Sequence, residues 1–358
     1  MKKILSLTLA LFLIISSLPF AAALKHEYFT YVDNGDGTCK ITGYNDFYAD
    51  SVTIPKTIKG LTVVSITGFR QKNSIQSVFI PETVVEIGAQ AFYNCKKLSS
   101  VAIGTGVKTI GKSAFYGCEE LTSVNLRNTE YLGEMAFQGC KKLNWVNCGT
   151  ALKEIGARAF WNAKKIDFLK FSPTLEAIGD YAFASCELIP SLTFPDSLKS
   201  IGLSAFSNCI ALEAITFGKG ELSISAYAFE NCTLLTEVTI PENVISIGRN
   251  AFAFREANST QFTHTVRINC HLGSAGVTYS IKNNAPVYII ELGRLIDNFG
   301  DIDGDGSVTT LDARKALRLA STIETNYSDE MLLLGDLNLS GSFDIEDANI
   351  ILERAAGI

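Results

Sequence analysis

The stretch EIGAQAFYNCKKLSSVAI, residues 86–103, recurs along the chain and decides the fold. Copies in the same register include TIGKSAFYGCEELTSVNL (109–126) and SIGLSAFSNCIALEAITF (200–217). The phenylalanine of each AF pair marks the period, with steps of 23 residues and once 22, at Phe92, Phe115, Phe137, Phe160, Phe183, Phe206, Phe229 and Phe252. A fixed period of this length is typical of a solenoid in which each repeat forms one coil.

Each repeat has two halves that predict different local structures. In IGxxAF the isoleucine, alanine and phenylalanine would face inward. The LxxVxI half alternates like a half-exposed strand, with Leu98, Val101 and Ile103 facing inward in the first full copy. One repeat cannot bury its apolar face alone, whereas stacked coils share a core, which explains a hydrophobic content of 47%. About nine coils at ~4.8 Å spacing would extend over roughly 40–45 Å.

The cysteines follow the same period. One repeat position is held by cysteine in six copies and by Ala163 in another: Cys95, Cys118, Cys140, Cys186, Cys209 and Cys232. A position that accepts cysteine or alanine is a small buried site, so we predict free thiols packed as small apolar groups, and neither disulfides nor metal ligands.

These copies resemble the BspA-like leucine-rich repeats of bacterial surface proteins, whose pattern IGxxAFxxCxxLxxVxIP is matched over about residues 60–255. Residues 28–66 are similar to the family's N-terminal cap and GSAGVTYSIKNNAPVYII (273–290) to its ending. We therefore assign residues 24–290 to a β-rich leucine-rich-repeat solenoid with both caps. The resemblance implies roles in adhesion and in binding proteins or host surfaces.

The N-terminus has the layout of a secretory signal peptide. Lys2 and Lys3 precede the apolar run 5–20, and three alanines (21–23) offer a cleavage site. We predict removal of residues 1–23, secretion, and no membrane insertion. With 31 basic and 37 acidic side chains, the charge balance gives no indication of nucleic-acid binding.

Near the C-terminus, GDIDGDGSVTTLDARKAL (300–317) has the spacing of an EF-type calcium loop. Such a loop takes ligands from positions 1, 3, 5, 7 and 12 and needs glycine at position 6. Counting from Asp301, Gly306 occupies position 6, and the ligands would be Asp301, Asp303, Asp305, Ser307 and Asp312. A helical pattern then follows, so the segment predicts a loop followed by a helix.

A second copy, DLNLSGSFDIEDANIILERAAGI, begins at Asp336, 35 residues later. Its ligands would be Asp336, Asn338, Ser340, Ser342, Asp344 and Asp347. We predict two structural Ca²⁺ ions, with tighter binding at the first loop because it has more carboxylates. A third acidic stretch, VDNGDGT (32–38), fails the same count, since position 12 from Asp33 is Tyr44; it is expected to form a hairpin turn.

The duplicated loop–helix with aspartate at position 12 resembles the dockerin module of cellulosomes over about residues 295–358. We assign 291–298 to a linker and 299–358 to a small all-α dockerin with two EF-hand-like units. The resemblance implies calcium-dependent docking onto a cohesin of a scaffoldin. It places the cohesin contacts at Thr310, Leu311, Lys315, Arg318, Leu319, Ile345, Glu346, Asn349 and Arg354. The two copies differ in charge and polarity, so symmetric two-way docking is not implied.

The solenoid surface offers aromatic side chains as candidate ligand contacts. Alternation exposes Trp145 and Phe168 on adjacent strands, and a second row holds Tyr93, Tyr116 and Trp161. Such residues suit protein or sugar rings, although lateral packing could also cover them. We interpret the chain as a secreted, non-catalytic binding protein with an unknown extracellular protein or surface ligand. The alternatives are a carbohydrate-binding accessory protein of a cellulosome, and an unrecognised hydrolase that uses Cys270 with His264 or His271.

Overall fold

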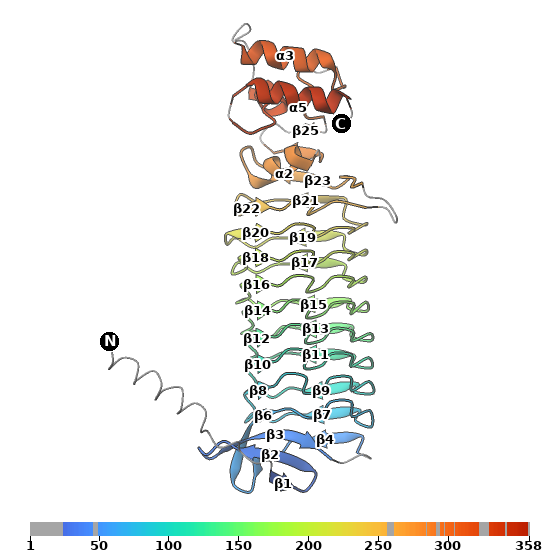
Figure 1. Cartoon of the computed structure of the whole chain (residues 1–358), viewed down its shortest axis with the longest axis vertical. Helices are drawn as coiled ribbons and strands as arrows, with labels where there is room; N and C mark the ends of the chain where they lie inside the picture. The colour runs from blue at the N-terminus through green and yellow to red at the C-terminus, as the bar shows by residue number, and fades with distance from the viewer. Residues whose placement is uncertain are drawn as a thin grey trace, which may run out of the picture.

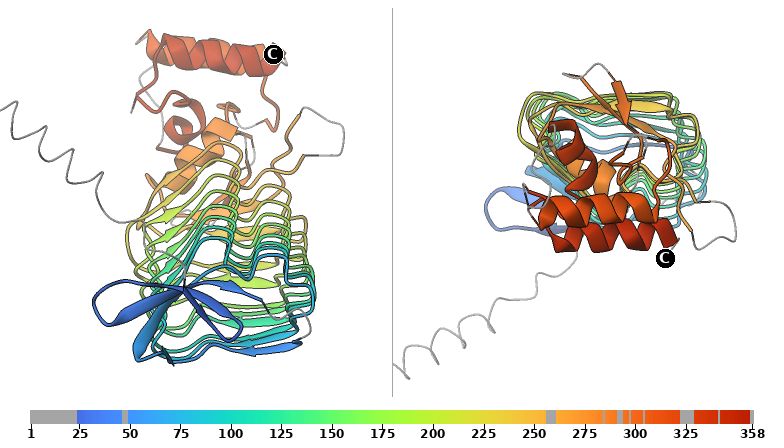
Figure 2. Two further views of the ribbon diagram at one scale, coloured as in Figure 1. Left: turned by 60° about the horizontal axis from the view of Figure 1, so that its bottom comes forward. Right: turned by 90° about the horizontal axis from the view of Figure 1, so that it is seen from above.

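The structure is a computed structural model that describes residues 24–45, 49–255, 261–283, 285–290, 294–296, 298–303, 305–321, 329–340 and 342–356. The predicted signal peptide, residues 1–23, lies outside these ranges. Flat coils stack along the length of the molecule, with a hairpin at the N-terminal end and helices at the C-terminal end (Figure 1). Seen from above, the coils nearly superimpose, as expected for similar repeats (Figure 2, right).

One long sheet runs along one side of the stack, with one parallel strand from each coil. Strands one repeat apart pair in register, so that Ile110 lies opposite Leu132 and Leu132 opposite Ile155. The strands of the coils are β6 (Leu61–Ile66), β8 (Glu86–Ile87), β10 (Thr109–Ile110), β12 (Tyr131–Leu132), β14 (Glu154–Ile155), β16 (Ala177–Ile178), β18 (Ser200–Ile201), β20 (Leu222–Ile224) and β22 (Val244–Ile247). The predicted solenoid of ~23-residue coils is confirmed.

The N-terminal end of this sheet is a three-stranded hairpin structure. It consists of β1 (Leu24–His26), β2 (Phe29–Asp33) and β3 (Thr38–Tyr44), and the short β5 (Thr57–Ile58) pairs with β6. Asn34 donates its N–H to the Thr38 oxygen across the turn, and Gly35 and Gly37 adopt positive φ. The acidic stretch at 32–38 is therefore a hairpin turn, as predicted.

The LxxVxI halves form short strands on a second side of the stack. These are β4 (Ser51–Thr53), β7 (Ser77–Phe79), β9 (Ser100–Ala102), β11 (Ser123–Asn125), β13 (Trp145–Asn147), β15 (Phe168–Lys170), β17 (Ser191–Thr193), β19 (Ala214–Thr216) and β21 (Glu237–Thr239). They group into separate sheets, with breaks between β9 and β11, between β15 and β17, and between β19 and β21. In the coil before the break between β15 and β17, Asp167 donates its N–H to the Asn144 oxygen; the equivalent residue one repeat later is Pro190, which has no N–H to donate.

A ladder of stacked phenylalanines fills the core. Phe115 and Phe137 have ring centroids 5.0 Å apart and an interplanar angle of 3°, and the same contact joins each ring from Phe69 to Phe252 to the next. Tyr44 stacks on the N-terminal end, and Tyr279 meets the C-terminal ring edge-on. The Tyr279 hydroxyl also accepts the Phe252 N–H at 3.0 Å. The two caps thus close the ladder at both ends.

The glycine of the IG pair allows the coils to approach closely. A Cβ on Gly156 would lie 2.6 Å from the Glu134 nitrogen of the previous coil, which is too close for any side chain. Most coils have glycine at this position; Ser225 replaces it in one coil, and nothing in the structure explains this exception.

All nine cysteines are buried and none forms a disulfide; six of them form the ladder at the repeat position. Each thiol of the repeat position donates to a phenylalanine carbonyl of the coil before; Cys118, for example, contacts the Phe92 oxygen at 3.3 Å. Burial raises the pKa of these thiols, to about 11 for Cys95. The predicted small buried position is confirmed, and the hydrogen bond adds a reason for cysteine that the sequence pattern did not reveal.

The C-terminal cap covers the last coil with helix α2 (Ala275–Asn283) and three strands: β23 (Arg267–Cys270), β24 (Val287–Ile289) and β25 (Arg294–Ile296). Because β25 pairs with β24, with Leu295 opposite Tyr288, the predicted linker 291–298 contains part of the cap sheet. Beyond it lie α3 (Thr310–Ala320), α4 (Asp329–Gly335) and α5 (Ile345–Ala356). No helix among the described residues is long and apolar enough to cross a membrane.

Candidate functional site

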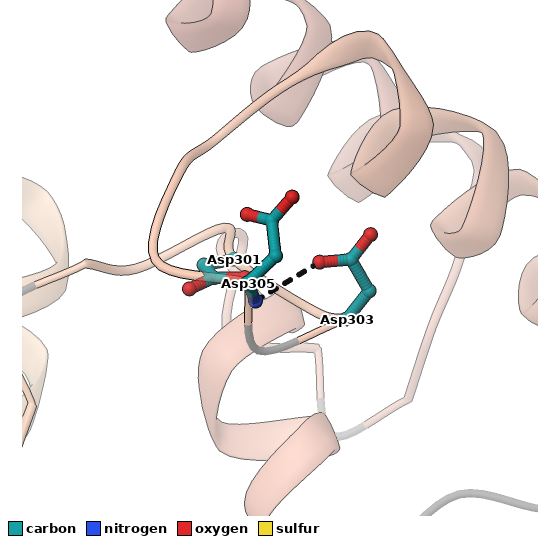
Figure 3. A group of neighbouring side chains, drawn as sticks. All are labelled: Asp301, Asp303 and Asp305. Atoms are coloured by element: carbon teal, nitrogen blue, oxygen red, sulfur yellow. Dashed lines mark hydrogen bonds between the residues drawn. The ribbon is translucent and has the colours of Figure 1, made fainter.

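The first acidic loop brings three carboxylates together. Oxygens of Asp301, Asp303 and Asp305 lie within 4.8 Å of one another, although Asp301 is buried and the other two are exposed. The Asp305 N–H donates to the Asp303 carboxylate at 3.2 Å, and the three side chains gather around one turn (Figure 3). The backbone donates to Asp301 from Asp305 and Gly306. Gly306 has φ 92°, which confirms the sharp turn expected at position 6.

Position 12 ties each loop to its helix. The Asp312 carboxylate is fully buried and accepts the N–H groups of Ile302, Asp303 and Thr309 at 2.8–3.1 Å. Thr309 in turn caps α3 in a capping box with Asp312. This aspartate therefore closes the loop through three backbone donors that would otherwise be unpaired.

The second loop repeats this pattern. Asp347 is fully buried and accepts the N–H groups of Leu337, Asn338 and Asp344, at the same three offsets as in the first loop. The Asp336 carboxylate likewise accepts the Ser340 N–H. Two segments 35 residues apart thus fold into the same loop with the same hydrogen bonds.

The side chains at the middle positions differ between the loops. The Asn338 amide donates to Asp344 at 2.9 Å, and the Ser340 hydroxyl donates to the Ser342 oxygen. The hydrogen bond from Asn338 lowers the pKa of Asp344. Both loops are lined by oxygen atoms that can coordinate a hard cation such as Ca²⁺. The first loop carries more negative charge than the second.

The predicted cohesin contacts divide into exposed and inward-facing residues. Leu311, at position 11 of the first loop, and Ile345, at position 10 of the second, are 49% and 63% exposed. Other exposed side chains are Thr310, Arg318, Glu346 and Asn349. Leu317 and Leu352 are also exposed and were missed, because their helical spacing is the same as that of core leucines.

Three predicted contacts point inward and are corrected here. Leu319 is only 5% exposed and packs in the core. The half-buried Lys315 ammonium donates to the Ile302 oxygen. Arg354 donates to the Phe299 and Ile281 oxygens, and its burial lowers its pKa. The resemblance implies contacts along the helices, whereas the approach of the solenoid cap to α5 buries part of Arg354 against Phe299 and Ile281.

The aromatic candidates form two separate surfaces. Trp145 and Phe168 stack with centroids 5.5 Å apart, Phe168 being 43% exposed. Tyr93 and Tyr116 stack at 4.9 Å in the other row, while Trp161, also exposed, lies beyond Gln138 of the intervening coil.

Each aromatic surface borders a groove. The first, here called the asparagine groove, has a volume of about 940 Å³, and its walls include Asn125, Arg127, Asn147, Phe168, Lys170 and Thr193. The second, the tyrosine groove, measures about 430 Å³, and its walls include Tyr93, Tyr116, Trp161, Lys96, Glu119 and Lys141. Glu119 forms ion pairs with both lysines there, so these charges are balanced.

Comparison with known proteins identifies the repeats. The family described as "BspA type Leucine rich repeat region (6 copies)" matches residues 42–167 and 153–271, more than half of the chain. The chain belongs to this family. No curated protein matches its sequence.

Solved structures similar to this BspA-type chain include two leucine-rich-repeat proteins. A leucine-rich cell surface protein of Faecalibacterium prausnitzii A2-165 is 26% identical with a TM-score of 0.53, and the match covers 66% of this chain and 74% of that one. A leucine-rich-repeat protein of T. pallidum is 24% identical with a TM-score of 0.46, over 60% of this chain and 91% of that one.

Both grooves lie within the residues that match the BspA-type family, whereas the acidic loops lie beyond them. The alternative hydrolase site has little geometric support. Cys270 is fully buried, and the His264 ring nitrogen lies 3.5 Å from the Tyr279 hydroxyl in the cap. No acidic residue is among the described residues that line the asparagine groove, so it lacks the carboxylate pair of a glycosidase.

Proposed function

We propose that this protein is a secreted, non-catalytic binding protein that is attached through a C-terminal dockerin to a cohesin of a scaffoldin. The observation that carries the proposal is the matched hydrogen bonding of Asp312 and Asp347, since two loops with the same closure and the same ligand spacing are the signature of a duplicated calcium module.

Calcium has a structural role in this proposal. The ion in the first loop is held by Asp301, Asp303, Asp305, Ser307 and Asp312, and the second by Asp336, Asn338, Ser340, Ser342, Asp344 and Asp347. Each ion neutralises clustered carboxylates that otherwise repel one another, and so stabilises the loops against unfolding. Cohesin binding then uses the exposed face around Leu311 and Ile345, two apolar side chains in the first turns of α3 and α5.

The solenoid displays the ligand-binding surface. Its rigid stack presents both grooves outside the cell, and the name of the F. prausnitzii relative, a cell surface protein, supports this location. A carbohydrate-binding accessory role is a second candidate, because stacked and exposed aromatics border both grooves.

A binding screen tests the attachment. The full chain is applied to an array of cohesins with calcium or with a chelator. We expect retention on at least one cohesin in calcium and loss of retention with the chelator. Substitution of Leu311 and Ile345 by aspartate should abolish retention while leaving calcium binding intact. Retention that is unchanged by the chelator, or no retention by any cohesin, would reject the proposed attachment through a dockerin.

A further inference from the structure

The asparagine groove lies where the solenoid departs from its period. The single 22-residue step, from Phe115 to Phe137, is caused by a shortened turn after β11. In that turn Arg127 adopts φ 49°, and Gly149 of the next coil adopts φ 69°. A Cβ on Gly149 would overlap the Arg127 oxygen. The break between β15 and β17 lies beside it. The surface is therefore hollowed where the regular stacking is interrupted.

The groove is rich in hydrogen-bond donors. The side-chain oxygens of Asn125 and Asn147 accept the N–H groups of Arg127 and Gly149, two residues further along. This leaves the amide NH₂ of each asparagine as its free hydrogen-bonding group toward the groove. Thr193 adds an exposed hydroxyl. Such a lining selects a ligand that has many acceptor oxygens.

The groove also carries unbalanced positive charge on an acidic protein. Nine lysines of the solenoid form ion pairs with glutamates, mostly from a neighbouring coil. Arg127 and Lys170 form no ion pair with the described residues, and both are exposed. The chain as a whole has a net charge of −6. Two unpaired cations without a lining carboxylate therefore attract an anionic ligand.

The ligand has a repeating and ring-containing structure. The lining residues come from successive coils, so a polymer along the stack would meet equivalent side chains every ~4.8 Å. Phe168 stacks on Trp145 on one side, while the equivalent residue of the next coil is the small Ser191, which cannot cover the other face with a ring. The uncovered face of the Phe168 ring is electronegative because of its π-electrons, and so it suits the C–H groups of a sugar ring.

We propose that the asparagine groove binds a polysaccharide whose sugars carry carboxylate groups. Arg127 and Lys170 pair with the carboxylates, Asn125 and Asn147 donate to hydroxyl and ring oxygens, and Phe168 stacks on a sugar ring. This inference rests on the proposed role of the solenoid as an extracellular binding surface, and it names the class of ligand.

The test is affinity electrophoresis of the full chain in gels that contain polygalacturonate or alginate. Fully methyl-esterified polygalacturonate is the control for charge, because it has the same sugar without free carboxylates. Polyglutamate is the control for the sugar, because it is an acidic polymer without sugar rings. We expect retardation by at least one carboxylated polysaccharide, weakened by salt and absent with the ester. The double variant Arg127→Asn/Lys170→Gln should weaken binding about tenfold. Asparagine tolerates the left-handed backbone at position 127, which protects the fold.

Lys165→Gln, which removes an exposed charge outside the groove, should leave binding unchanged, and Phe168→Ala should weaken it. Thermal melts monitored by circular dichroism confirm that each variant is folded. Equal binding of the ester, binding of polyglutamate alone, no binding at all, or no effect of the double variant would overturn the inference. Calcium titration of the same samples distinguishes the dockerin proposal from the polysaccharide proposal. Normal calcium binding without saccharide binding would reject only the polysaccharide site in the asparagine groove.

Discussion

The Arg354 guanidinium donates a hydrogen bond of 2.9 Å to the main-chain oxygen of Ile281, 73 residues earlier in the sequence. The same guanidinium donates to the Phe299 oxygen at 2.8 Å. One side chain of α5 thus joins the C-terminal helices to the cap helix of the solenoid. A planar guanidinium can serve both carbonyls at once, which a lysine ammonium does less well.

Arg354→Ala should loosen this connection. Charge-assisted hydrogen bonds contribute about 1.5–3 kcal/mol each when well formed, and the half-buried position reduces this. We expect faster amide hydrogen exchange in α5 and α2, with the central coils unchanged. Arg314→Ala, at an exposed site on α3, is the control. Unchanged exchange in both helices would show that Arg354 does not hold the two parts together.

Phe137→Ala should strongly destabilise the solenoid. The ring lies between Phe115 and Phe160, with centroids 5.0 and 5.3 Å away, and is fully buried. Truncation of a buried phenylalanine costs about 3–5 kcal/mol. Urea unfolding should show this loss, whereas Phe168→Ala at the exposed surface should cost less than about 1 kcal/mol. Similar losses for both variants would mean that the ladder contributes no more than the surface stack.

The buried cysteines should not react with thiol reagents while the protein is folded. All nine thiols are buried, and burial raises the pKa of Cys95 to about 11 and that of Cys148 to about 12. We expect no reaction with a thiol reagent at pH 8 in the folded protein, and nine equivalents after denaturation. Rapid reaction of the native protein would indicate that the ladder is accessible.

The same pKa shifts predict a loss of stability at alkaline pH. A thiol with a raised folded pKa keeps its proton in the folded state and loses it first in the unfolded chain. The contribution of this thiol to folding stability is therefore complete below its unfolded-state pKa near 9. It declines as the pH rises toward the folded-state pKa. Each such thiol should lower the unfolding free energy by about 1.4 kcal/mol per pH unit in this window. Cys95→Ala should reduce the slope measured by urea unfolding at pH 8–11.

The repeat pattern predicted most of the solenoid because each core position occurs many times. Phe92 and Leu98 could be assigned inward since their equivalents recur in coil after coil. The asparagine groove could not be predicted, because it lies beside departures from the repeat such as the shortened turn at Arg127 and the proline at position 190. A single irregular residue has no repeat against which its geometry can be judged.

The loops were predicted by counting ligand positions, but their surroundings were not. Ligand spacing is local, so Asp301 and Asp336 could be aligned without knowing the tertiary structure. The inward orientation of Leu319 and Arg354 depends on packing between distant segments. The strand β25 within the predicted linker was missed for the same reason, since its partner lies in the cap.

A calorimetric titration of the metal-free full chain with Ca²⁺ tests the central claim most directly. We expect two equivalents, with tighter binding at the first loop, because three carboxylates converge there whereas the second loop offers Asn338 and Ser340 at two of these positions. Asp303→Asn should weaken the tighter site and Asn338→Asp should strengthen the other. Binding of one equivalent or none, or tighter binding by the second loop, would contradict the duplicated calcium module.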